Sequence, residues 1–177
     1  ADRGLCGNFN GSIVRAAREQ IRQLQGAGKQ VKLVFVGRKA RDMMGRDVDA
    51  QTLQTFRDFA RPRLNYEAAQ KVCAYLLEQF EAGAFDQCSV LYNRFKSAIS
   101  QIPTVQQLIP LPVQNTEVSA AAGSALYLYE PSEEQIVETL LPRNLGVQMY
   151  KAMLESAASE HGARMTAMDN ATRNAGD

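Results

Sequence analysis

The chain ends in the sequence Glu160-His161-Gly162-Ala163-Arg164-Met165-Thr166-Ala167-Met168-Asp169-Asn170-Ala171-Thr172-Arg173-Asn174-Ala175-Gly176-Asp177. This stretch reads as a helix, although it contains almost no large aliphatic residues. Its two methionines and a run of alanines form a thin apolar stripe, and the rest of its surface is polar. A narrow stripe is typical of packing against another helix rather than against a globular core. The sequence therefore predicts a terminal helix that needs a partner helix.

The same helical pattern extends upstream from this stretch. No strong helix breaker occurs from Arg143 to Gly176, and Gly146 and Gly162 weaken the helix without ending it. A helix of ~35 residues is about 50 Å long, whereas a compact domain of the preceding residues has a radius of gyration of roughly 14 Å. The helix is therefore expected to protrude. Its stripe recurs at steps of three and four residues, at Tyr150, Leu154, Ala157, His161, Met165, Met168 and Ala171.

The remaining chain, residues 1–142, predicts an α/β domain with a Rossmann-like, mostly parallel sheet and flanking helices. A helix at 12–25 is followed by the glycine turn 26–28 and by an apolar run at 31–37, which is typical of a strand buried on both faces. Because residues 1–11 resemble the turn that follows a first strand, we expect that strand to be missing. The other expected elements are a helix capped by Asn65 that runs to Phe80, strands at 89–95 and 105–111, a loop at 115–124, a brief strand at 127–129, and a helix to Leu141 opened by a capping box of Ser132 and Gln135.

Charge and cysteine content exclude several classes of protein. The net charge of +1 gives no indication of nucleic-acid binding. Basic residues gather between Arg38 and Arg63, but aspartates are interleaved with them, which favours a solvated mixed face over a phosphate site. Three cysteines without metal-site spacing favour reduced thiols. No apolar run approaches the ~20 residues of a membrane span, and we expect no signal peptide.

Few residues offer chemistry of their own. The glycine-rich turn at 4–11 precedes a helix and could bind phosphate there, but it lacks the P-loop ending, so a structural turn is favoured. Cys6 could be a nucleophile, yet His161 is expected to lie far from it on the protruding helix. Glu133, Glu134 and Glu138 suit a helix start better than paired-carboxylate catalysis. No metal or cofactor site is predicted.

Several motifs resemble one known family. Asp2-Arg3-Gly4-Leu5-Cys6-Gly7 is similar to the opening signature of the γ subunit of F-type rotary ATP synthases. Residues 159–175 resemble the C-terminal helix motif of that family, Ser-Glu-x-x-Ala-Arg-Met-x-Ala-Met-x-x-Ala-Thr-x-Asn. Further matches, in the same order as in the family, are 92–97, 130–132 and 140–142. The chain is therefore identified as a member of that family and corresponds to its central portion.

The resemblance implies a rotor shaft without a catalytic site, because nucleotide chemistry in this family belongs to the β subunit. The terminal helices of the family form an antiparallel coiled coil inside the α and β hexamer, and residues 143–177 would begin one of them. The α/β domain would lie beside the ε subunit (δ in mitochondria) and on the c-ring. The complex would be held at the cytoplasmic face of a bacterial plasma membrane or at the matrix face of the mitochondrial inner membrane.

The resemblance also implies roles for individual residues. Contacts to the hexamer or the shaft would come from Arg3, Cys6, Arg164, Asp169, Asn170 and Asn174. Coiled-coil packing would come from Leu154, Ala157, Met165, Met168 and Ala171. Two alternatives come from the residues alone: a small Rossmann-like nucleotide-binding enzyme that uses the 4–11 turn, and a helical adaptor with an unrelated partner.

Overall fold

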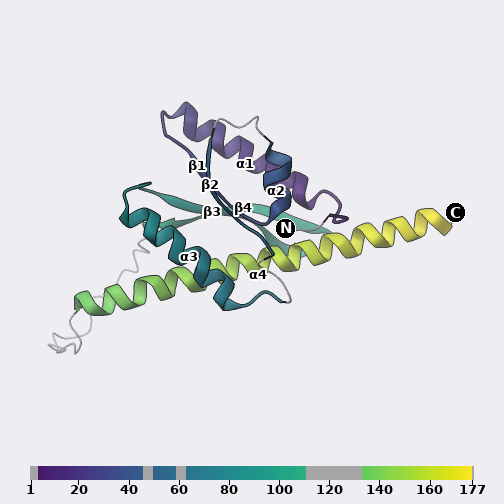
Figure 1. Ribbon diagram of the computed structural model, residues 1–177. Helices are drawn as coiled ribbons and strands as arrows, with labels where there is room; N and C mark the ends of the chain where they lie inside the picture. Colours follow the sequence, from purple (N-terminus) through teal and green to yellow (C-terminus); the bar gives the residue numbers. More distant parts are fainter. Residues whose placement is uncertain (1–3, 46–49, 59–62, 111–132, 177) are drawn as a thin grey trace, which may run out of the picture.

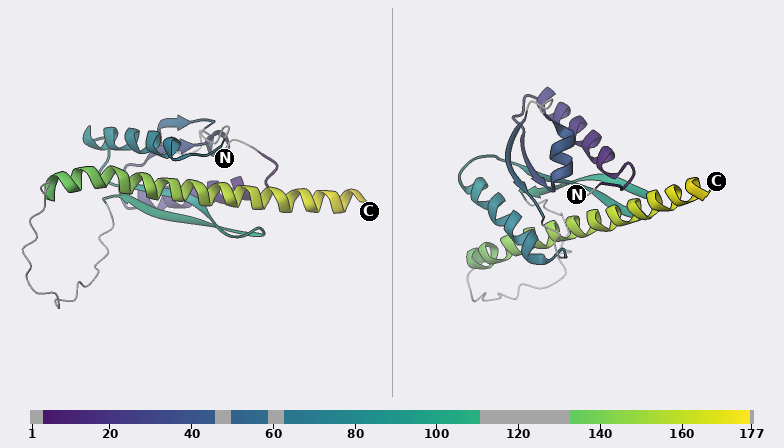
Figure 2. Two further views of the ribbon diagram at one scale, coloured as in Figure 1. Left: turned by 90° about the horizontal axis from the view of Figure 1, so that it is seen from below. Right: turned by 45° about the vertical axis from the view of Figure 1, so that its right-hand side comes forward.

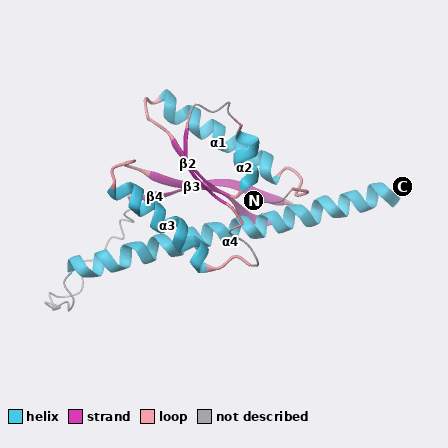
Figure 3. Cartoon of the chain, viewed as in Figure 1, coloured by secondary structure: helices cyan, strands magenta, loops and turns pink. Residues whose placement is uncertain are grey.

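The computed structural model describes residues 4–45, 50–58, 63–110 and 133–176 (Figure 1). The elements follow the chain in the order helix, parallel strand pair with a short helix between, helix, hairpin and long helix. They are α1 (Phe9–Gly26), β1 (Lys32–Val36), α2 (Arg38–Met44), β2 (Gln51–Phe56), α3 (Tyr66–Glu81), β3 (Cys88–Ser97), β4 (Ser100–Ile109) and α4 (Glu133–Gly176). This arrangement confirms the expected α/β class with flanking helices and a long C-terminal helix (Figure 3).

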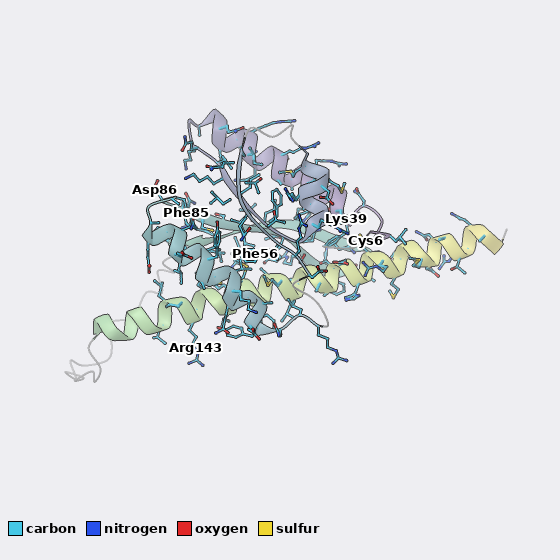
Figure 4. The ribbon with its side chains drawn as sticks, in the orientation of Figure 1. Cys6, Lys39, Phe56, Phe85, Asp86 and Arg143 are labelled. Atoms are coloured by element: carbon cyan, nitrogen blue, oxygen red, sulfur yellow. The ribbon has the colours of Figure 1, made fainter. Side chains whose placement is uncertain are left out.

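The parallel pair β1–β2 is covered on both faces, as the apolar run at 31–37 predicted. Leu33 and Phe35 pack against the cluster formed by α1 and α2. Val34, Val36 and Phe56 pack against the larger core on the other side. Phe56 lies near the middle of the molecule in Figure 4. Its ring meets the ring of Tyr75 in α3 edge to face at a centroid distance of 5.8 Å. Successive side chains of a strand point to opposite faces of the sheet. The parallel pair therefore contacts α1 and α2 on one face and the larger core on the other.

The strands β3 and β4 form an antiparallel hairpin, which the expectation of a mostly parallel sheet did not include. Both strands are longer than predicted, and β4 passes through Pro103. Pro103 lies opposite Asn93 in the register. The predicted end of this strand at Leu111, the 115–124 loop, the 127–129 strand and Ser132 of the capping box lie outside the described residues.

Two elements of the 38–63 segment were missed, because that segment was interpreted only as a charged surface. It contains α2, which has 7 residues, and β2, whose sequence Gln-Thr-Leu-Gln-Thr-Phe is mostly polar. The helix predicted after Asn65 is confirmed, and the Asn65 side chain accepts a hydrogen bond from the Ala68 amide at 2.9 Å. Phe80, at the predicted end of this helix, is 40% exposed, and its ring centroid lies 5.7 Å from that of Phe85.

The helix α4 is longer than the sequence suggested. It begins at Glu133 and continues through Pro142, so the expected boundary between residues 142 and 143 falls inside it. Its 44 residues correspond to a length of about 66 Å. The core of the domain is built on its first half, where Leu145 and Met149 pack with residues of α3 and β4. Figure 2 shows that the C-terminal end of α4 extends beyond the other elements.

Candidate functional site: the long helix and its contacts with the N-terminal turn and the hairpin

The N-terminal turn packs on α4. Cys6 and Phe9 form a buried cluster with Ala163 of the helix (Figure 4). A side-chain carbon placed on Gly7 would lie 4.0 Å from the Ala167 Cβ, so the backbone of the turn lies close to the helix. The turn needs two left-handed residues, Leu5 and Gly7. Gly7 therefore supplies a left-handed residue at the point where the turn lies against α4.

The environment of Cys6 opposes a nucleophilic role. The thiol is 2% exposed, and the Asn10 amide nitrogen donates to its sulfur at 3.2 Å. Burial, helped by the nearby Glu160 carboxylate, raises the pKa of Cys6. Reactive cysteines have lowered pKa values instead. Packing against α4 therefore explains this residue better than covalent chemistry.

The expectation that Cys6 lies far from the helix segment of His161 is wrong, because the turn packs on that segment. Cys6 contacts Ala163, two residues beyond the histidine. Two residues correspond to roughly 200° around a helix, and the His161 side chain is exposed. The histidine therefore lies on the far side of α4 from the thiol. The N-terminal turn and this part of α4 are far apart in the sequence, so the sequence alone does not indicate that they are in contact.

The other two cysteines, Cys73 and Cys88, are expected to make the stability of the fold depend on pH. Burial raises the pKa of Cys73 to about 12, with a smaller contribution from Cys88, and burial raises the pKa of Cys88 to about 11. The folded state therefore keeps thiols neutral that ionise from about pH 9 in the unfolded chain. Stability is expected to be fully present below that pH and to fall as the pH rises, by at most about 1.4 kcal/mol per pH unit for Cys73.

Urea unfolding at a series of pH values between about 8 and about 11 checks this expectation. The control is Cys73→Ala, which should show a shallower loss of stability with pH than the wild-type chain. Equal slopes for the two chains would contradict the burial of an ionisable thiol at this position.

The helix α4 has two apolar sides, and the domain covers only one of them. The covered side includes Leu145 and Met149, which are 1% and 3% exposed. The second side, which we call the outer stripe, consists of Leu154, Ala157, Met165, Met168 and Ala171. Leu154, Met165 and Met168 are 44%, 62% and 44% exposed, Ala171 is exposed and Ala157 is half-buried. Every described residue from Met168 to Gly176 is exposed.

Polar residues of the motif lie around the same part of α4. Arg164 forms an ion pair with Glu160, and both side chains are about one-fifth exposed at 21% and 18%. Arg173 forms an exposed pair with Asp169 at 2.7 Å. Asn170 and Asn174 are exposed. Arg3 lies outside the described residues.

Sequence reasoning missed a row of contacts between α4 and the hairpin, which we call the seam: Glu155, Ser159, Gly162 and Thr166 on the helix, and Asn93, Phe95 and Ala98 on the hairpin. The Phe95 amide donates to a Glu155 carboxylate oxygen at 2.9 Å. The Ser159 hydroxyl donates to the Asn93 carbonyl at 2.9 Å. The Thr166 hydroxyl lies 3.1 Å from the Ala98 carbonyl. The four helix residues recur at steps of four, three and four residues, which is a helical spacing, but this spacing alone does not indicate a contact with the hairpin.

Two other kinds of site find no support in the described part of the chain. No cluster of three or more potential metal ligands occurs within the described ranges. None of the described helices combines the length and apolarity needed to cross a membrane.

In the 38–63 segment, Arg38 and Asp42 form an exposed pair at 3.8 Å, as expected for a solvated mixed face.

Comparison with known proteins gives consistent matches along the whole chain. A family model described as ATP synthase matches residues 1–177. The chain is 49% identical over 183 residues to the ATP synthase gamma chain of Rhodospirillum rubrum. It is 51% identical over 178 residues to that of Paramagnetospirillum magneticum. All of this chain is covered in both cases, and it spans about three-fifths of the length of these relatives, 61% and 60%.

Solved structures show the same fold. A central stalk and c-ring structure of the Tetrahymena thermophila mitochondrial ATP synthase matches with a TM-score of 0.75 and 26% identity, covering 97% of this chain and 73% of the other. A rotor structure of the Euglena gracilis mitochondrial enzyme matches with a TM-score of 0.65, covering 98% of this chain and 64% of the other. At 24% identity, the second match supports the fold alone.

Proposed function

The chain belongs to the ATP synthase family, and we propose on that premise that it is the central part of a non-catalytic γ subunit, the rotating shaft of a proton-translocating F-type ATP synthase. The shaft transmits rotation between a membrane c-ring and a catalytic hexamer during ATP synthesis or hydrolysis. Similarity to gamma chains over the whole of this chain supports this role.

The observation that carries the proposal is the two-sided helix α4. One side holds the domain together through Leu145 and Met149. The outer stripe leaves Met165 and Met168 exposed where α4 leaves the domain, and the C-terminal end of the helix extends beyond the other elements (Figure 1). Exposed large apolar side chains at helical spacing suit a second helix. A coiled coil with another segment of the full-length subunit would cover them.

The partners follow from the same role. The coiled-coil end lies within a hexamer of α and β subunits, and the domain contacts the ε subunit (δ in mitochondria) and the c-ring. The Tetrahymena match, described as a central stalk with its c-ring, supports the last contact. Other subunits hold the chain at the membrane, on the cytoplasmic face in bacteria or on the matrix face in mitochondria.

Arg164 is proposed to contact a β subunit, and Arg164→Ala is expected to lower coupled ATP synthesis while the domain stays folded. The substitution leaves the Glu160 carboxylate without its ion-pair partner, so stability should fall by about 1 kcal/mol. ATP synthesis by membrane vesicles that carry the full-length variant, together with urea unfolding, measures both effects.

The matched control is Arg173→Ala, which removes an ion pair of the same spacing from a more exposed site. The side chains of this pair are 74% and 56% exposed, so its loss should change stability by less than about 0.5 kcal/mol. Unchanged synthesis and hydrolysis with Arg164→Ala would refute the role of Arg164.

The proposal as a whole is tested by purification of the native complex from source membranes with an antibody to this chain. Mass spectrometry should identify α, β and ε subunits and a γ chain larger than 19.5 kDa. Recovery of a free chain without ATPase subunits would overturn the proposal and favour the small-enzyme or the adaptor alternative. Saturable nucleotide binding by that free chain would then distinguish the enzyme from the adaptor.

A further inference from the structure

We propose that the seam is the contact through which torque passes between the shaft helix and the domain; this inference rests on the proposed rotor function. The seam lies at the place where α4 leaves the domain. Thr166 is its last residue, Ala167 is half-buried, and all described residues from Met168 onward are exposed. A load applied to a projecting helix is borne first by the last contact that supports it.

The hydrogen bonds of the seam fix the helix against the strand in one register. Apolar contacts are non-directional and tolerate sliding, whereas hydrogen bonds require defined distances and angles. At the centre of the seam, Ser159 and Asn93 are both fully buried, at 0% exposure. The Asn93 carbonyl and the Phe95 amide lie two residues apart on β3, so both point to the same edge of the strand, where α4 lies. The helix side chains of Ser159 and Glu155 therefore supply the hydrogen-bond partners for this edge.

The seam also reaches a third element. The Asn93 side-chain amide donates to the carbonyl of Phe9 at 3.2 Å, and Phe9 begins α1. Phe9 packs in turn with Cys6 and Ala163. Rotation of α4 about its axis would thus strain β3 and α1 together. The helix is anchored to the whole α/β domain rather than to one strand.

Close approach of helix and hairpin depends on Gly162. A side-chain carbon at this position would lie 3.0 Å from the Ala98 Cα and 3.2 Å from the Phe95 ring. The first of these atoms is backbone, so the hairpin itself would have to move. Gly162, which a helix ordinarily disfavours, is explained by this contact.

The test uses the full-length subunit in the assembled complex and compares Glu155→Ala, Ser159→Ala and Thr166→Val with wild type. ATP-driven proton pumping and ATP hydrolysis are measured on the same vesicles, and hydrogen exchange is measured at the Phe95 amide. We expect less pumping per ATP hydrolysed in each variant. In Glu155→Ala, the Phe95 amide should exchange about tenfold faster, because it loses a charged acceptor.

Thr104→Val is the matched control for Thr166→Val. Both threonines are half-buried, and each places its hydroxyl about 3 Å from a backbone carbonyl of the hairpin. The Thr104 contact, at 3.0 Å, lies within β4, whereas the Thr166 contact, at 3.1 Å, joins α4 to the hairpin. Thr104→Val should therefore leave pumping per ATP unchanged. If Ser159→Ala prevents assembly, Thr166→Val at the half-buried end of the seam still carries the test.

The outcomes separate this inference from the rotor function. Wild-type pumping per ATP in the seam variants would overturn the inference, whether or not exchange at Phe95 increases, and would leave the rotor function intact. An equal loss in Thr104→Val would also overturn it, because the effect would then not depend on the contact between the helix and the hairpin. Failure of the wild-type subunit to assemble with ATPase subunits would instead refute the proposed function.

Discussion

Replacing Leu145 with alanine is expected to lower the free energy of unfolding by about 3 kcal/mol, within the range found for fully buried leucines. Leu145 is 1% exposed and lies in the core where α4 meets α3 and β4. Alanine would leave a cavity there that neighbouring side chains fill only in part. Urea unfolding of the variant and the wild-type chain measures the difference.

Leu154→Ala is the matched control, since it makes the same chemical change on the same helix. The nine residues between the two positions correspond to about 2.5 turns, which places the two leucines on opposite sides of α4. Leu154 is 44% exposed, so its replacement should cost less than about 0.5 kcal/mol in this chain. Similar losses for both variants would contradict the two-sided description of α4.

Introducing glutamate at both Met165 and Met168 is expected to reduce the rate of ATP synthesis by the assembled complex at least tenfold. A tenfold loss corresponds to a free-energy change of about 1.4 kcal/mol. The proposed coiled coil buries both positions, and an unpaired carboxylate in an apolar helix interface carries a large desolvation cost. The stability of the present chain should change little, because both side chains are exposed in it, at 62% and 44%. ATP synthesis by vesicles that carry the full-length variant measures the effect.

Met43→Glu is the control for this experiment. Met43 lies on α2 in the domain, and it is 45% exposed, compared with 44% for Met168. Its substitution should leave synthesis near the wild-type rate. Normal synthesis with glutamates at 165 and 168 would show that the outer stripe does not face a helix in the complex.

Local periodicity was sufficient to predict the helices that carry the core. The spacing of apolar residues and the Asn65 cap located α3, and the continuous apolar run located β1. The unusual length of α4 was also visible, although Pro142 suggested a break that packing of Leu145 and Met149 overrides. In each case the signal lies within a few turns of helix or one strand.

Elements that depend on distant parts of the chain were not predicted. β2 has a polar sequence and pairs in parallel with β1, so its strand character depends on a neighbour. The contact of Cys6 with Ala163 joins the two ends of the chain, and no local pattern reports it. The seam likewise joins Glu155 to Phe95 through a backbone amide, which carries no sequence signature.

Direct observation of rotation by this chain tests its proposed place in the shaft. A bead is attached to a cysteine introduced at Lys29, an exposed residue between α1 and β1, in a complex that is immobilised through its hexamer. We expect unidirectional rotation of the bead while ATP is present and arrest when ATP is removed. A bead that stays fixed while the same complexes hydrolyse ATP would contradict the claim that this chain is part of the shaft.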